Sequence, residues 1–271
     1  MFQPLCGLFQ QTKYLPLRYA PLEIELELAD VLDPIINLNA TFADVNTSQL
    51  WEIENCMVKV DLCTLDNALE NSCVSHFMGG KTINIVYNTF ISTLQTVVAA
   101  ETQINVSRSL SKMKSVFVSL DKGFTGTRKY HYNKVWNNFW SPNAGHGMTG
   151  VLTHEGERFS HFQLQIGSKL FPEYPIKTHA EAFYSLRKAL GIQANNLHSI
   201  DMEGNEYRNN KFIVGIDTEK LLGLSFTGMN TRNNLMTVHL KTQDVNYKAD
   251  RMHIILLAEQ ILELGDSGSM V

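Results

Sequence analysis

The fold is decided by the stretch that begins Lys211-Phe-Ile-Val-Gly-Ile-Asp217 and runs to Val271. This apolar run is typical of a buried strand, and it leads to the glycine-containing turn Phe226-Thr-Gly-Met-Asn-Thr-Arg-Asn-Asn234. The segments Leu235–Lys241 and Met252–Ala258 then predict two further strands. Because the chain ends on strands of this kind, we expect them to close a β-sandwich.

Short segments with alternating apolar and polar residues continue this pattern upstream. The strongest alternation begins at Leu22, and the locally basic run Arg108–Lys122 is interpreted as one solvated strand face. No repeat of about 20–50 residues is visible, and the even rhythm with long excursions at the loops favours an all-β Greek-key sandwich or jelly roll. The predicted upstream strands are 22–28, 51–65, 83–87, 89–99, 103–110, 114–120 and 161–167.

Two helices interrupt the strand pattern. The clearer one is a short α-helix near 178–190, where Thr178 and Glu181 form a predicted capping box and Gly191 ends the helix. The other is a short helix that Asp66 caps and that Gly79-Gly80 ends. His179 falls in the first turn of the clearer helix, where the dipole disfavours a cation, so we expect it to be a neutral packing or capping residue.

Composition excludes several classes of protein. The chain has 271 residues, of which 44% are hydrophobic and 18% charged, as in ordinary globular proteins. A formal charge of −4 without a basic block argues against a nucleic-acid groove. No apolar run approaches the roughly 20 residues of a membrane helix, and the N-terminus lacks the pattern of a secretory signal. We expect free thiols, because no CxxC pair is formed by Cys6, Cys56, Cys63 and Cys73.

Two local patterns suggest chemistry that their surroundings do not support. Gly265-Asp-Ser-Gly268 matches the nucleophile tetrapeptide of trypsin-like proteases, but the histidine segment and the strands of a specificity pocket are missing, which favours a flexible tail. A set of histidines lies in an irregular stretch with Glu155 and Glu157, too widely spaced for a zinc site. These histidines are His131, His146, His154 and His161. We therefore predict no catalytic residue, no metal site and no cofactor.

A long segment without clear periodicity, 121–160, carries the aromatic residues Trp136, Phe139 and Trp140. Aromatic side chains can stack on a sugar ring, but they also favour the cores of subunit interfaces. We favour packing or a subunit contact, with a carbohydrate-binding β-sandwich that uses the aromatic loop 136–140 as the alternative. A sandwich-fold enzyme with an unrecognised site is a third hypothesis.

The order of several diffuse motifs resembles double jelly-roll major capsid proteins of double-stranded DNA viruses and related elements. Tyr14–Leu28 is similar to the LPL segment of a late strand in their first barrel, and Trp51–Glu70 to the segment that begins their second barrel. Phe90–Thr96 and Ile104–Val118 resemble strands that follow in that family, and the block from Lys211 resembles its closing turn and strand pair. No single motif is diagnostic, so the resemblance rests on their order.

The resemblance implies a structural capsid protein that is not an enzyme. Residues 1–49 would hold late strands of an incomplete first jelly roll plus a linker, and 50–271 a complete second jelly roll with a long excursion at 121–160. The family forms homotrimers that imitate hexamers and tile icosahedral shells, so the expected partners are the chain itself, neighbouring capsomers and minor or penton proteins. The expected location is the virion capsid, after synthesis in the host cytoplasm or nucleus, without specific nucleic-acid binding or membrane insertion.

Overall fold

The computed structural model describes only part of the chain. The described residues are 7–9, 13–19, 21–25, 27, 52–121, 159–191, 202, 204, 207, 211–219, 228–242, 249–265 and 268–270. In this part of the chain, no helix is long and apolar enough to cross a membrane.

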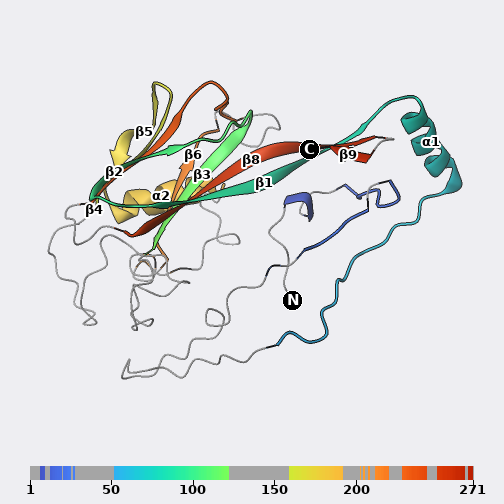
Figure 1. Ribbon diagram of the computed structural model, residues 1–271, viewed down its shortest axis with the longest axis horizontal. Coiled ribbons are helices and arrows are strands. Elements are labelled where there is room, and N and C mark those ends of the chain that lie inside the picture. Colours follow the sequence, from blue (N-terminus) through green and yellow to red (C-terminus); the bar gives the residue numbers. More distant parts are fainter. Residues whose placement is uncertain are drawn as a thin grey trace. The chain divides into compact units, whose positions relative to one another are not determined.

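Two antiparallel sheets form the fold (Figure 1). Sheet A has the strand order β1-β8-β3-β6, and sheet B has the order β2-β7-β4-β5. The strands of sheet A are β1 (Ile83–Thr96), β3 (Met113–Asp121), β6 (Ile213–Asp217) and β8 (Arg251–Gly265), with β9 (Gly268–Met270) paired to the end of β8. The strands of sheet B are β2 (Glu101–Val106), β4 (Phe159–Ile166), β5 (Lys169–Ile176) and β7 (Met236–Thr242).

This strand order is that of a jelly roll. The first, eighth, third and sixth strands form one sheet, and the second, seventh, fourth and fifth form the other. From β1 to β8 each strand is followed by one in the opposite sheet, except that β4 and β5 pair as neighbours in sheet B, which is the arrangement of a jelly roll. The predicted all-β jelly-roll fold is therefore confirmed. The helices whose bounds fall within the described residues are η1 (Gly7–Phe9), α1 (Asn67–Met78) and α2 (His179–Ala189).

The core of the sandwich follows from the alternation of its strands. In β7 every second residue is buried, and in β8 the same period holds from Arg251 to Ala258. The buried sets of the two sheets join in one hydrophobic cluster. Its members include Val116, Val118, Leu120, Met252, Ile254 and Leu256 from sheet A and Ile104, Phe162, Leu164, Val238 and Leu240 from sheet B.

The chain divides into two compact units. One unit is Phe90–Ala258, which holds most of the jelly roll and α2. The other combines Met1–Thr89 with Glu259–Val271 and contains α1, where the ring of Tyr19 packs 4.6 Å from that of Phe77. The boundary falls inside β1 and β8, so one end of each strand belongs to one unit and the other end to the other unit.

Helix α2 begins at a complete capping box, as predicted. The backbone N–H of Glu181 donates to Thr178 Oγ1 at 3.1 Å, and the Glu181 carboxylate accepts from the N–H groups of Thr178 and Lys177 at 3.2 and 2.8 Å. The hydrogen bond from Lys177 is the main reason why the pKa of Glu181 is lowered. The cap thus satisfies backbone donors that a helix start otherwise leaves unpaired.

Replacing Thr178 with alanine is expected to lower the free energy of unfolding by about 1 kcal/mol, because the Glu181 N–H loses its acceptor. Urea unfolding followed by circular dichroism measures the change. Thr178→Ser keeps the hydroxyl and is the matched control, so it should retain most of the stability. Equal losses in the two variants would contradict a role for the cap.

Some sequence predictions differ from the structure. The predicted strands at 22–28 and 51–65 are wrong in their described residues, because 21–25, 27 and 52–66 form no regular structure. The two strands predicted at 83–87 and 89–99 are one strand, β1. β5 was not predicted because Pro172 and Pro175 lie within it, which an edge strand tolerates.

Candidate functional site

The outer face of sheet A is the most distinctive surface of the jelly roll. In the register of the sheet, Phe117 pairs with Gly215 on β6 and with Ile255 on β8, so these residues share the face that points away from sheet B. β3 is buried on almost every residue, which requires a cover on both faces. The prediction that 108–122 forms a solvated strand face is therefore wrong for β3.

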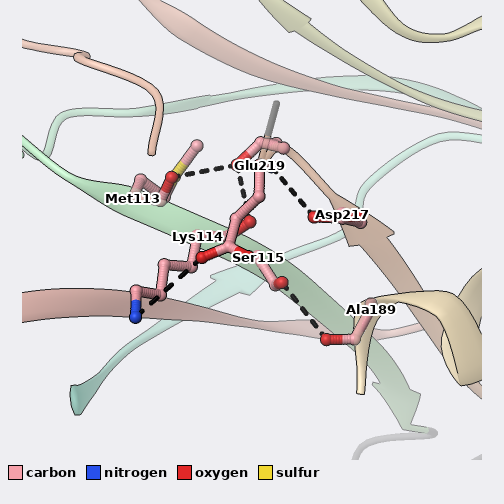
Figure 2. Close-up of polar contacts among 7 residues, drawn as sticks. Met113, Lys114, Ser115, Ala189, Asp217 and Glu219 are labelled. Atoms are coloured by element: carbon pink, nitrogen blue, oxygen red, sulfur yellow. Dashed lines mark hydrogen bonds and ion pairs between the residues drawn. The ribbon is translucent and has the colours of Figure 1, made fainter. Parts of the chain in front are cut away.

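Helix α2 is the cover over β3 and β6 (Figure 1). The helix lies so close to the sheet that a Cβ on Gly215 would stand 3.0 Å from the Leu186 Cα and 3.0 Å from the Ala189 Cβ. The Ser185 hydroxyl donates to the carbonyl of Gly215 at 2.6 Å, and the Ser115 hydroxyl donates to the carbonyl of Ala189 at 3.3 Å (Figure 2). A glycine in the strand and two serines at the contact thus hold the helix against the sheet.

An aromatic cluster packs beside this helix. The rings of Tyr207 and Phe212 lie 5.4 Å apart, and His179 packs edge-on 5.5 Å from Phe212. The Tyr207 hydroxyl donates to the carbonyl of Ile213 at 2.7 Å, and burial raises the pKa of Tyr207. The structure confirms a packing role for His179.

Polar contacts tie β3 to the end of β6 (Figure 2). The Thr218 hydroxyl donates to the carbonyl of Lys114 at 2.8 Å, and the Glu219 N–H donates to the Asp217 carboxylate at 2.9 Å. Lys114 Nζ and Glu219 Oε1 lie 3.9 Å apart, with both side chains largely buried. These contacts fix the edge strand β6 and are structural in character.

A charged cluster lies at the opposite end of β3. The buried carboxylate of Asp121 accepts from Arg251 Nε at 2.8 Å and contacts His253 Nε2 at 2.5 Å. Burial raises the pKa of Asp121, but hydrogen bonds from His253 and Arg251 and their positive charges outweigh it, so the pKa is lowered. The cluster therefore holds an ionised carboxylate in the sheet, and this arrangement joins β3 to β8.

No described element covers the half of the sheet A face that β8 and β1 form. The Tyr87 hydroxyl donates to the side chain of Gln260, and the N–H of Val97 donates to the carbonyl of Asp250. Residue numbers thus rise along β1 as they fall along β8, so the two strands run antiparallel. Phe90 and Leu94 on β1 are 48% and 50% exposed, and Ile255 and Leu257 on the neighbouring β8 are only partly buried. This half carries apolar side chains in water, whereas the other half has its helix.

The outer face of sheet B is different in chemistry. His239 Nε2 lies 2.9 Å from Gln165 Oε1, and the Thr237 hydroxyl donates to Asn105 at 2.9 Å. Lys241 forms an ion pair with Glu101 at 3.1 Å. The polar side chains of this face satisfy one another across strands, as expected for a face in contact with water.

Several residues that the sequence singled out lie outside the described part of the chain. They are Cys6, Trp136, Phe139, Trp140, His131, His146, His154, Glu155, Glu157, Asp266 and Ser267. His161 lies in β4, and the described residues include no group of three His, Cys, Asp or Glu side chains that could hold a metal ion. Gly265 pairs with Gly268 in the β8–β9 pair, so the expectation of a flexible tail there is wrong.

No local pattern in the sequence indicated the Asp121 cluster or the open face. Asp121 is the first residue of the predicted irregular segment 121–160, and Arg251 precedes the predicted strand 252–258 by one position. A usable signal was Arg-Met-His at 251–253, where an arginine and a histidine flank an apolar residue at the start of a strand. Their partner lies far away in the sequence, so only the register of β3 against β8 reveals it.

Comparisons with known proteins give structural similarity at very low sequence identity. No protein-family model matches the sequence, and no curated protein matches it. A quasi-atomic model of the PBCV-1 virus capsid is similar at 8% identity with a TM-score of 0.43, over 75% of this chain and 54% of that chain. PBCV-1 VP54, fitted into a cryo-EM reconstruction of the virophage Sputnik, is similar at 9% identity with a TM-score of 0.42, over 76% of this chain and 54% of that chain. This chain thus spans about half the length of these structures.

Proposed function

We propose that the chain is a structural subunit of a viral capsid that forms homotrimers and assembles with neighbouring capsomers in an icosahedral shell. The observation that carries the proposal is the jelly-roll strand order of sheets A and B, an architecture that viral capsid subunits share with lectins and cupins. The order of motifs along the sequence, which resembles double jelly-roll capsid proteins, favours the first of these. The role is structural, without cofactor or catalysis.

The surfaces of the sandwich support this role. A shell subunit needs a rigid framework and apolar surfaces that stay exposed until a neighbouring subunit covers them. Sheet B presents a self-satisfied polar face, while sheet A leaves Phe90 and Leu94 exposed. As part of the same proposal, 50–271 is the second jelly roll of a double jelly-roll subunit, and 1–49 belongs to the first.

Size-exclusion chromatography with light scattering, followed by negative-stain imaging, tests the proposal. We expect a mass of three times the 30.7 kDa chain and pseudo-hexagonal particles. The measurement is repeated over a dilution series, because weak association depends on concentration. A monomer at every concentration would count against assembly, and glycan binding by that monomer would favour a carbohydrate-binding sandwich.

A further inference from the structure

An apolar, strand-like segment of the chain lies exposed in water. We call residues Cys56–Leu62 the arm. Val58, Val60 and Leu62 alternate with Lys59 and Asp61, which is the pattern of a half-buried strand. Yet Val58, Val60 and Leu62 are 71%, 62% and 80% exposed. The alternation starts just after Asn55, whose positive φ of 54° turns the chain.

The arm has the sequence pattern of a strand but no partner strand. Its residues form no regular secondary structure, and none of them is hydrogen-bonded through the backbone to another described residue. An extended segment with free N–H and C=O groups and one apolar face is suited to join the edge of a sheet, where both are satisfied together. The wrong strand prediction at 51–65 and the exposure of the arm thus have one explanation: the segment is a strand that needs a partner.

Among the four sheet edges of the jelly roll, β1 suits the arm best. β5 is interrupted by Pro172 and Pro175, which cannot donate to a neighbour. β6 has only five residues, and β2 exposes the polar residues Glu101, Gln103 and Asn105. β1 has fourteen residues and no paired strand on its outer side among the described residues.

Among the described residues, the part of the β1 edge that has no backbone partner on its outer side is Phe90–Thr96. Nearer its start, β1 is in contact with the N-terminal segment, because Gly7 packs against the backbone of Asn88 and Lys13 Nζ donates to the carbonyl of Asn84. Phe90–Thr96 is as long as the arm and contains no charged residue, so Asp61 meets no like charge there. Its exposed Phe90 and Leu94 would continue the apolar face of the arm.

We propose that the arm of one copy of this chain adds as a strand to the Phe90–Thr96 edge of β1 in a second copy. Both surfaces are exposed within one chain, so a second copy supplies the missing half of each. The exchange extends sheet A by one strand and satisfies backbone groups at its edge. It also sets Val58, Val60 and Leu62 beside Phe90 and Leu94 on one face, where adjacent side chains partly shield one another from water. This inference rests on the proposed function and adds to it by naming the segment that joins two copies. It requires that the chain self-associates, but it does not depend on the architecture of the shell.

Paired substitutions test the two halves of the contact. The double variant V58K/V60K puts charge on the apolar face of the arm, and Leu94→Lys puts charge on the edge. Analytical ultracentrifugation of the full chain is expected to show that each raises the dissociation constant of self-association at least tenfold. Leu170→Lys, at an exposed leucine on the edge of sheet B, and Leu69→Lys, at an exposed leucine of α1, are controls that should leave the constant unchanged.

Mixing the variants separates exchange between copies from docking within one chain. V58K/V60K retains an intact edge, and Leu94→Lys retains an intact arm. A mixture of the two variants should therefore form oligomers at lower concentration than either variant does alone. Docking within one chain predicts no such recovery and would overturn the proposal. Because all substituted side chains are exposed, thermal unfolding should be unchanged and confirms that each variant folds.

The outcomes separate this proposal from the proposed function. Wild-type oligomers that are unaffected by V58K/V60K and Leu94→Lys would overturn the arm proposal and leave capsid assembly standing. Association that depends on the arm but never gives trimers or particles would support the arm and count against the capsid role. A wild-type chain that stays monomeric at every concentration would overturn both.

Discussion

Replacing Gly215 with valine is expected to lower the free energy of unfolding by about 3 kcal/mol, the largest effect of any single change proposed for this chain. The new Cβ would lie 3.0 Å from the Leu186 Cα and from the Ala189 Cβ, closer than ordinary contact distances. The Leu186 Cα belongs to the helix backbone and cannot rotate away. Helix α2 must therefore move off β6, which also breaks the bond between Ser185 and the Gly215 carbonyl.

Thermal unfolding and urea titration of Gly215→Val and Gly215→Ala measure this effect. The alanine variant adds one methyl group and should lose less stability than valine. Gly204→Val is the matched control, because a Cβ at Gly204 meets no atom within 4 Å. If Gly215→Val and Gly204→Val lost equal stability, close packing of α2 on the sheet would not be the cause.

Replacing Asp121 with alanine is expected to be the second most damaging change, with a loss of about 2 kcal/mol at neutral pH. The substitution leaves the guanidinium of Arg251 and the ring of His253 without their buried carboxylate. Loss of one partner of a fully buried pair costs more, but both partners here are partly open to solvent, which reduces the penalty. Asp217→Ala, at the end of β6, removes only a bond from the Glu219 N–H and is the milder control.

The effect of Asp121 is also expected to depend on pH. The pKa of its carboxyl is lowered in the folded protein from an ordinary value of 3.8, so the folded state binds the proton less tightly than the unfolded state. The contribution of Asp121 is therefore complete above the unfolded pKa and is lost as the pH falls through the folded pKa. Urea midpoints between about pH 3 and 7 should show the gap between wild type and Asp121→Asn closing below about pH 4. A gap that widens on acidification would contradict this assignment.

Local signals predicted the parts of the fold that depend on local chemistry. The capping box at Thr178 and Glu181 and the alternation of β7 and β8 need no knowledge of distant residues, and the structure confirms them. The arm shows the limit of such signals. Alternation at 51–65 indicates a surface that suits a strand, but a strand forms only where an edge is available to pair with it.

The site features depended on contacts between distant residues. Asp121 meets Arg251 and His253 only because β3 pairs with β8 in one particular register, and Gly215 lies under α2 only because the helix packs on β6. The residues next to Asp121 and Gly215 in the sequence form no pattern that indicates these contacts. A glycine in a strand is compatible with close approach of another backbone, but the sequence does not name the approaching partner.

The unequal outer faces of the two sheets give the sandwich a direction. Hydrogen bonds and an ion pair across strands already satisfy the side chains of one face, so contact with another protein there would gain little and would require water to be stripped from them. Phe90 and Leu94 on the opposite face lose nothing by being covered. A building block with one apolar face and one water-facing face associates through the apolar face, and this restriction disfavours disordered aggregates that grow in all directions.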